Sequence, residues 1–233
     1  MTSPSGERIE ALESLLAERY SCRAFRPDLV PRSTIERILT AAQRTASWCN
    51  SQPWQVIVAS DAAARRFSEV IHDAATGTGS AHGAQSDFPF PREYKGVYLD
   101  RRRESGFQLY NALGIERGDK DGYRRQTLQN FKLFGAPHVA IISTDEALGV
   151  YGAVDCGGYV NNFLLAAQAL GVATIPQAAL AGFSGVIRQH FGLGDDRRVV
   201  CGISFGFAEA DHAANSYRTN RATLQDAATF LES

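Results

Sequence analysis

The sequence predicts a single domain over residues 1–233 in which helices and strands are mixed and helices predominate. Two observations support this prediction. The chain is 44% apolar and 10% aromatic, which is enough to bury one large core. Most apolar residues recur with the 3.6-residue period of a helix, whereas only a few short apolar runs have the length of strands.

The first half of the chain predicts three helices and a strand. Apolar residues three and four positions apart mark a helix over 7–18, which Ser5 would cap. Pro31 begins a second helix, and the run Q-V-I-V-A over 55–59 reads as a short buried strand. A third helix follows over 62–75.

The stretch from 76 to 95 predicts a long loop. It is rich in Gly, Ser and Pro, and it carries Phe88, Phe90 and Tyr94. Loops of this length inside a compact domain are more often functional or mobile than idle. We therefore expect a lid or a pocket wall here.

The second half predicts three more helices and further strands. The expected elements are helices over 96–114 and 120–132, a central strand over 138–143, a long buried helix over 151–170 and a strand over 199–205. The stretch from Cys156 to Ile187 has no charged residue, but amides, Gly171 and Pro176 interrupt it. It therefore predicts a buried helix followed by a strand, and no membrane span.

Charge and the first residues restrict the partners and the location. The net charge is −1, from 24 basic and 25 acidic residues, so nothing favours nucleic acid or an anionic membrane as a partner. Residues 1–10 are polar and lack the apolar region of a secretory signal. We expect a cytoplasmic protein.

The four cysteines predict neither disulfides nor a metal site. Cys22, Cys49, Cys156 and Cys201 are widely spaced, without a C-x-x-C pair or a nearby group of histidines. Cys49 lies inside a polar motif and is either a reactive thiol or a small buried residue. We favour the buried residue.

Two short polar runs indicate a nucleotide-like ligand. Arg19, Ser21 and Arg23 alternate, so an extended backbone would point all three to one face, which suits a phosphate. Asn50 and Gln52 have the same spacing, and their amides can match the mixed donors and acceptors of a flat heterocycle.

A third polar cluster lies near the C-terminus. Asn215, Arg218 and Arg221 follow the last expected strand. Arginine forks bind phosphate oxygens in pairs, so these side chains can complete a phosphate site with Arg19.

One motif suggests another chemistry and is set aside. The run from Gly202 to Gly206 matches the G-x-S-x-G pattern of serine hydrolases, which requires a sharp turn from strand into helix. Here the flanking residues are strand-like and no helix follows. The two glycines are better explained by close packing in a core strand.

Together, these runs resemble the FMN-dependent nitroreductase family. Five runs fall in the family's order: R-x-S-x-R-x-F at 19–25, N-x-Q-P-W at 50–54, A-P-H at 136–138, P-Q-A-A at 176–179 and N-x-x-R-T-x-R at 215–221. The middle region, from 88 through 135, is also similar to the nitrobenzoate reductase branch. The resemblance implies an α+β three-layer sandwich, in which helices wrap a small mixed or antiparallel sheet. It also implies an interlocked homodimer with two FMN molecules at its interface.

The resemblance implies an FMN site made by twelve residues. They are Arg19, Tyr20, Ser21, Arg23, Asn50, Gln52, Pro176, Gln177, Ala178, Ala179, Arg218 and Arg221. Arg19 and Ser21 resemble residues that hold the phosphate and the ribityl chain. Arg221 and Arg218 would complete the phosphate shell.

The remaining implied contacts concern the flavin ring. Arg23 corresponds to a basic residue near the pyrimidine edge, where a positive charge stabilises the reduced, anionic ring. Asn50 and Gln52 would contact the ring edge or the ribityl oxygens across the dimer. The backbone N–H groups of Ala178 and Ala179 resemble a pair that faces flavin N5 and O4, where several relatives have glutamate and glycine.

The implied activity is reduction of a small nitroaromatic compound by NAD(P)H through FMN, in a ping-pong cycle that yields nitroso and hydroxylamine products. The flavin carries the chemistry, so no catalytic side chain is required. Trp48, Phe88, Phe90 and Phe134 are the candidate walls of the substrate pocket. Two alternatives stay open: a flavin oxidase of the same fold, and a flavin-binding protein without turnover.

Overall fold

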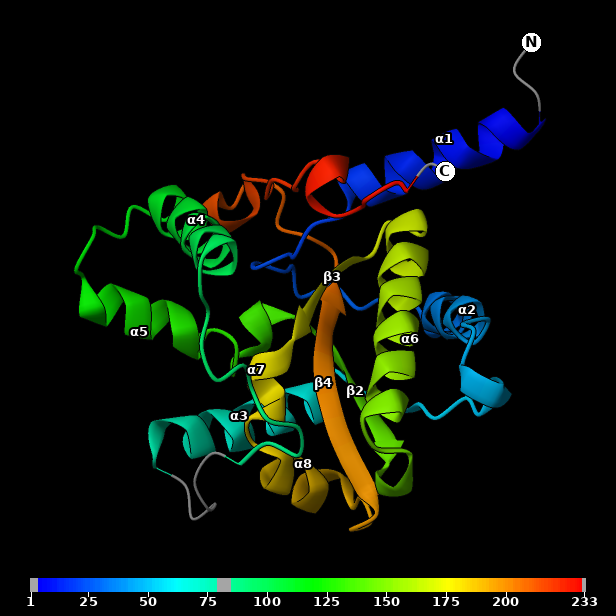
Figure 1. Ribbon diagram of the computed structural model, residues 1–233. Helices are drawn as coiled ribbons and strands as arrows, with labels where there is room; N and C mark the ends of the chain where they lie inside the picture. Colours follow the sequence, from blue (N-terminus) through cyan, green and yellow to red (C-terminus); the bar gives the residue numbers. More distant parts are fainter. Residues whose placement is uncertain (1–3, 79–84, 232–233) are drawn as a thin grey trace.

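A four-stranded antiparallel sheet forms the centre of the computed structural model, which describes residues 4–78 and 85–231 (Figure 1). The strands are β1 (Gln55–Ser60), β2 (His138–Asp145), β3 (Ala173–Gln177) and β4 (Arg197–Gly206). Their order across the sheet is β1-β2-β4-β3, so β2 is an interior strand, as expected. All three pairings are antiparallel, and the α+β class with a small antiparallel sheet is confirmed.

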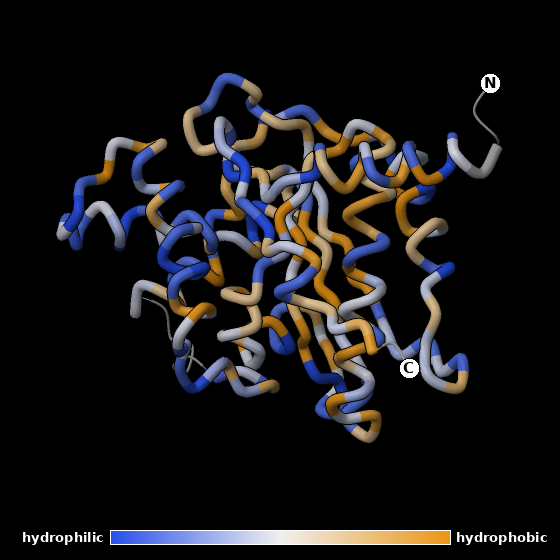
Figure 2. Tube along the Cα trace, turned by 45° about the horizontal axis from the view of Figure 1, so that its top comes forward, coloured by the Kyte–Doolittle hydropathy of each residue, from blue (hydrophilic) through white to orange (hydrophobic). Residues whose placement is uncertain are grey.

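Helices cover both faces of this sheet (Figure 1). Those of the described chain are α1 (Pro4–Glu18), α2 (Arg32–Ala42), α3 (Ala62–Thr76), α4 (Val97–Ala112), α5 (Lys120–Leu128), α6 (Gly149–Ala169), α7 (Ala178–Ala181) and α8 (Ser184–Phe191). α2 and α6 pack on one face, whereas α3, α7 and α8 lie on the other. Hydrophobic residues accordingly concentrate in the central strands, between polar outer segments (Figure 2).

The alternation of side chains along β2 divides the interior into two cores. Val139 and Ile141 pack with α3 and α8, while Ala140 and Ile142 pack with α2 and α6. In β4, Val200 is an extra residue opposite Ile142 and Ser143. This bulge reverses the alternation, so Val199 joins the α3 side although Ile203 faces the α6 side.

Two helix boundaries differ from those expected by several residues, and two short helices were not predicted. The first helix begins at Pro4, so Ser5 lies within its first turn and not at the position before it. The helix expected to end at 132 ends at Leu128, and turns follow it up to the positive φ angles of Leu133 and Phe134. The short helices α7 and α8 escaped prediction, since neither is long enough to show a helical period.

The loop after α3 is partly described. Its residues 79–84 lie outside the described chain, so the lid expected over 76–95 is tested only on either side of them. The uncharged stretch from Cys156 to Ile187 forms the end of α6, then β3, α7 and the start of α8, as a buried helix followed by a strand. Among the described helices, none has both the length and the apolarity to cross a membrane.

Candidate functional site

Six of the predicted site residues line one pocket of about 310 Å³. They come from both ends of the chain: Arg19, Tyr20, Ser21, Arg23, Arg218 and Arg221. Leu16, Ala17, Ser105, Tyr217 and Thr219 complete the described lining. Four guanidinium groups thus face one cavity, and no carboxylate belongs to that lining.

The first side of the pocket is an extended segment, as its alternating pattern predicts. Cys22 donates its backbone N–H to Thr174 O at 3.0 Å, and Ser21 forms a parallel bridge to the same residue of β3. Cys22 and Ala24 are buried, whereas Ser21 and Arg23 are half-buried and line the pocket. The edge of the sheet therefore sets which side chains face the cavity.

The C-terminal segment forms the opposite side. Asn215 is 3% exposed, and its Oδ1 accepts from the backbone N–H of Arg23 at 2.8 Å. Its Nδ2 donates to the carbonyls of Ala24 and Glu209, both at 2.9 Å. Asn215 is thus a buried connector between the two segments, and it does not belong to the pocket lining.

Hydrogen bonds and ring contacts orient the guanidinium groups. Arg23 Nη1 donates to Tyr217 Oη and to the carbonyl of Ser21, each at 3.1 Å. The guanidinium of Arg218 lies 3.7 Å from the centre of the Tyr20 ring. Arg221 Nη1 donates to Thr219 Oγ1 at 2.8 Å. Side chains already preordered in this way lose less entropy when an anion binds.

The pocket concentrates positive charge without an internal counterion. Within residues 4–78 and 85–231, no ion pair links any of these four arginines to a carboxylate. Burial, followed by repulsion from Arg221, lowers the pKa of Arg19. An anion between Arg19 and Arg221 would replace this repulsion with attraction. The geometry therefore suits a phosphate.

The P-Q-A-A run lies at the end of β3, on the strand that carries Thr174. Ala178 and Ala179 open α7, where the first N–H groups have no acceptor within the helix. Gln177 is 2% exposed, and its Nε2 donates to Asn130 O at 2.9 Å while its Oε1 accepts from Ser204. Its side chain is therefore directed into the protein, so at Gln177 only the backbone is free to meet a ligand.

The N-x-Q-P-W run is exposed and strained over Asn50–Gln52, whereas Pro53 and Trp54 are buried. Asn50 and Gln52 have φ angles of 54° and 47°, and Cys49 has 52°. Such angles in non-glycine residues cost energy and tend to occur at functional sites. Neither amide lies in the arginine pocket of the same chain. Gln52 Oε1 accepts from Gln43 Nε2 at 3.1 Å.

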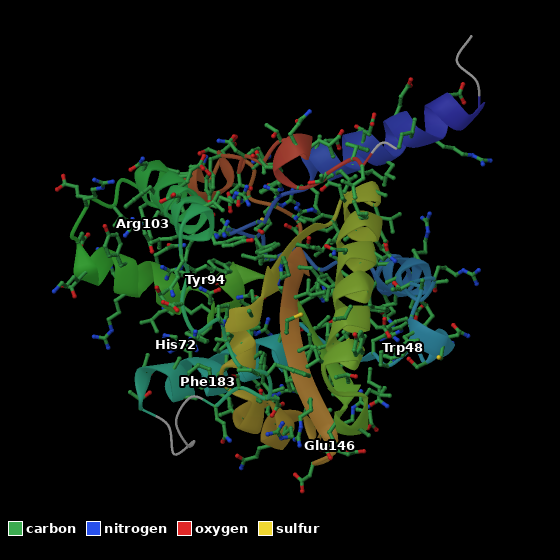
Figure 3. The ribbon with its side chains drawn as sticks, in the orientation of Figure 1. Trp48, His72, Tyr94, Arg103, Glu146 and Phe183 are labelled. Atoms are coloured by element: carbon green, nitrogen blue, oxygen red, sulfur yellow. The ribbon has the colours of Figure 1, made fainter. Side chains whose placement is uncertain are left out.

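The four candidate walls of the substrate pocket do not meet within one chain. Trp48 is 62% exposed and lies edge-on to Tyr151 of α6, on the side of the sheet opposite Phe183 (Figure 3). Phe134 is 6% exposed and belongs to the core on the α3 side. Phe90 is half-exposed, with its ring edge next to Gly182. Phe88 is half-buried in the same loop.

The G-x-S-x-G run and the cysteines do not form a catalytic site. Ser204 is fully buried inside β4 and bonds to Gln177, so the G-x-S-x-G run makes no nucleophile. A Cβ on Gly206 would lie 2.8 Å from Pro137, which confirms close packing as the reason for that glycine. All four cysteines are free, and Cys49 is exposed, so the expectation that it is buried was wrong. Its positive φ turns the segment outward.

Sequence reasoning missed Tyr217, Ser105 and Thr219 in the pocket lining. Tyr217 stands beside Arg218, and its position within the C-terminal motif could have suggested it. Ser105 comes from α4, whose run of three arginines indicated only a charged, solvent-exposed face. Only the packing of α4 near the C-terminal segment places it here.

The known proteins that resemble this chain fall in one family. The model of the Nitroreductase family matches residues 16–207. The chain belongs to the nitroreductase family. Among its nitroreductase relatives, nitroreductase NfnB of Mycolicibacterium smegmatis is 36% identical over 98% of this chain and 96% of the relative. A 4-nitrobenzoate reductase of Pseudomonas putida is 30% identical over 94% of this chain and 95% of that protein.

A solved nitroreductase has the same fold throughout. It is the FMN-dependent nitroreductase NfnB from Mycobacterium smegmatis in complex with NADPH, which superimposes with a TM-score of 0.90. The two sequences are 34% identical, and the match covers 97% of this chain and 100% of the solved chain.

Proposed function

We propose that this protein is an FMN-dependent NAD(P)H oxidoreductase that reduces small nitroaromatic compounds. The arginine pocket is the observation that carries the proposal. It offers four guanidinium groups and no lining carboxylate, and it adjoins β3, which leads to the N–H groups of Ala178 and Ala179. Relatives named for nitroreductase activity, similar over almost their whole length, support it.

The residues present fit FMN. Arg19, Arg218 and Arg221 would hold the phosphate through charge-assisted hydrogen bonds, with Ser21 beside them. From Ser21, paired with Thr174, to Ala178 the strand advances about 13 Å. A ribityl chain and a flavin ring can cover that distance. Pro176 and the backbone of Gln177 lie along this path.

When bound, FMN would accept electrons from NAD(P)H and deliver them to the nitro group. The chain's own residues position this chemistry. The Arg19 and Arg221 guanidinium groups would fix one end of the cofactor, and the N–H groups that open α7 would orient the other. Arg23, held by Tyr217 Oη, would keep a positive charge near the pyrimidine edge. A ping-pong order follows if nicotinamide and nitroaromatic compound use the same open face.

The exposed apolar residues support a homodimer. Val150, Tyr151 and Val154 of α6 are 61–71% exposed, and Trp48 lies against Tyr151. Ile9, Leu12 and Leu16 form a second exposed apolar row on α1. Exposed apolar rows of this kind mark protein interfaces. A partner subunit would bring its Asn50, Gln52 and Trp48 segment to a site that one chain leaves incomplete.

The visible spectrum of the purified protein tests this proposal. We expect flavin bands that bleach on anaerobic addition of NADPH or NADH and return when 4-nitrobenzoate is added. Bands that resist reduced nicotinamide would instead indicate an oxidase or a flavin-binding protein. A colourless protein that cannot be loaded with FMN would refute the assignment. The cytoplasmic location expected from the sequence is part of the same proposal.

A further inference from the structure

One ion pair differs from all others in the described chain. Arg188 Nη1 of α8 lies 2.7 Å from Oδ1 and 2.6 Å from Oδ2 of Asp87. The Asp87 and Arg188 side chains are only 7% and 20% exposed, whereas every other described pair has a side chain at least 53% exposed. This buried pair joins the loop after α3 to the helix that follows α7.

Further hydrogen bonds fasten the same part of the loop. Asp87 Oδ2 accepts the backbone N–H of Val199 in β4 at 2.7 Å. Its own N–H donates to Ser184 Oγ at 3.3 Å, and Ser184 N–H donates to Gln85 O at 3.2 Å. Residues 85–87 are thus bound to both α8 and β4. The described part of the loop that was expected to form a lid or a pocket wall is therefore fixed to the body of the domain.

The aromatic residues follow this anchor directly. Phe88 is the next residue, and a Cβ on Gly182 would lie 3.6 Å from Cε2 of Phe90. Gly182 closes α7, the helix that Ala178 opens. The anchor therefore determines where the Phe90 ring sits relative to the N–H groups of Ala178 and Ala179.

Stability alone does not explain a buried ion pair. Desolvation of two charges offsets much of their attraction, and apolar replacements of such pairs are often equally stable. A buried pair does impose one geometry, since each charge has a high cost in any arrangement that separates it from its partner. A loop rich in glycine and proline gains a defined position from such a contact.

We infer that Asp87 and Arg188 are positioning residues for the electron-accepting substrate. They hold the Phe88–Phe90 segment against the turn between α7 and α8, and so shape the wall beside the flavin-facing amides. This inference rests on the proposed function. It assigns acceptor selectivity to a contact in which neither side chain touches the substrate.

The test compares two half-reactions in Asp87→Asn. We expect FMN retention and the rate of bleaching by NADPH to stay within about twofold of the wild type. Turnover of 4-nitrobenzoate should lose about tenfold to a hundredfold in kcat/KM. The loss should appear mainly in KM, because a displaced wall weakens binding of the substrate in its ground state and its transition state alike. Asp28→Asn is the matched control, because Asp28 pairs with Arg26 on the surface.

A second variant keeps the inference testable if Asp87→Asn fails to fold. Asp87→Asn leaves Arg188 without its charge partner, so Asp87→Asn combined with Arg188→Gln removes both charges together. Trypsin gives a readout that is independent of activity. Arg92 and Lys95 are 93% and 76% exposed, and cleavage after them should accelerate in both variants once the anchor is lost.

Phe90→Ala tests whether the anchor acts through the Phe90 ring. If the anchor acts through this ring, the losses from Phe90→Ala and Asp87→Asn will not add in the double variant. Additive losses, or a folded anchor variant with wild-type KM for 4-nitrobenzoate, would overturn the inference while leaving the proposed function intact. A wild type that never bleaches with NADPH would refute the proposed function instead.

Discussion

The backbone N–H of Arg23 donates a hydrogen bond to Oδ1 of Asn215 over 2.8 Å. The two residues are 192 positions apart in sequence, and each lies in one of the arginine motifs. Because Asn215 also donates to the carbonyl of Ala24, it fixes the spacing between the two segments at two successive residues. The arginine pocket thus depends on a residue that does not line it.

Replacing Arg19 or Arg221 by alanine should weaken FMN binding. Each change removes a charge-assisted bond to phosphate worth about 1.5 to 3 kcal/mol, which is about tenfold to a hundredfold in Kd. Arg19 should have the larger effect, because it is half-buried while Arg221 is exposed and better screened by salt. Equilibrium dialysis of FMN measures both values. Arg32→Ala, at an 81% exposed side chain on α2, is the control. Unchanged retention in both variants would place the phosphate elsewhere.

Asn215→Ala should lower both stability and FMN affinity. The change removes the acceptor of the Arg23 N–H, at a cost of about 1 to 3 kcal/mol for that unsatisfied group. The carbonyl of Ala24 keeps the N–H of Glu209 as a donor and loses only the bond from Asn215. Urea unfolding of the FMN-free protein measures the first effect, and dialysis of FMN the second. Asn220→Ala provides the comparison, because Asn220 is exposed and its side chain bonds only to Glu104 among the described residues. Equal midpoints for the two variants would contradict the connecting role.

His138 should make the protein less stable in mild acid. Its ring is 2% exposed, Nε2 accepts the N–H of Val30 at 2.9 Å, and Nδ1 lies 2.8 Å from Ser60 Oγ. The buried ring is therefore neutral with its proton on Nδ1, and burial lowers its pKa from the ordinary 6.5, against the attraction of Asp61.

The sign of the pH effect follows from that direction. The unfolded chain binds the proton more tightly than the folded one, so the His138 contribution is complete above pH 6.5 and declines as the pH falls from 6.5 toward the lower folded-state pKa. Urea midpoints from pH 5 to 8 should show this decline in the wild type and a flatter profile in His138→Gln. Parallel profiles would exclude His138 as the source.

Val154→Glu should dissociate the proposed homodimer. Val154 is 61% exposed in the apolar row of α6, and a buried carboxylate at an interface has no partner to offset its desolvation. Light scattering after size exclusion should show monomers, and FMN retention should fall with them. Val70→Glu is the control, because it makes the same substitution at a 40% exposed position of α3, outside the apolar row of α6. A dimeric Val154→Glu protein would place the interface elsewhere.

Local patterns were sufficient for much of this molecule. Apolar spacing located the long helices and the strands, because burial on one side of an element repeats with the period of its backbone. The alternation of Arg19, Ser21 and Arg23 likewise predicted an extended segment with one polar face, and Cys22 and Ala24 are indeed buried between them. The polar runs sufficed for the resemblance to the family.

The tertiary structure alone decided which of these residues act together. Pairing of residues 21–22 with Thr174, and of Arg23 with Asn215, brings three distant motifs to one edge of the sheet. The tertiary structure also directs the Gln177 side-chain amide into the protein, where it bonds to Asn130.

The buried pair of Asp87 and Arg188 was also decided by the tertiary structure alone. Nothing in the spacing of the two residues along the sequence predicted it. Periodicity records whether a side chain is buried, whereas its partner is chosen by contacts between segments far apart in the chain. The sequence by itself thus determined the helices, the strands and the types of side chain available for binding. Only the packing around the sheet determined which of these side chains form the pocket.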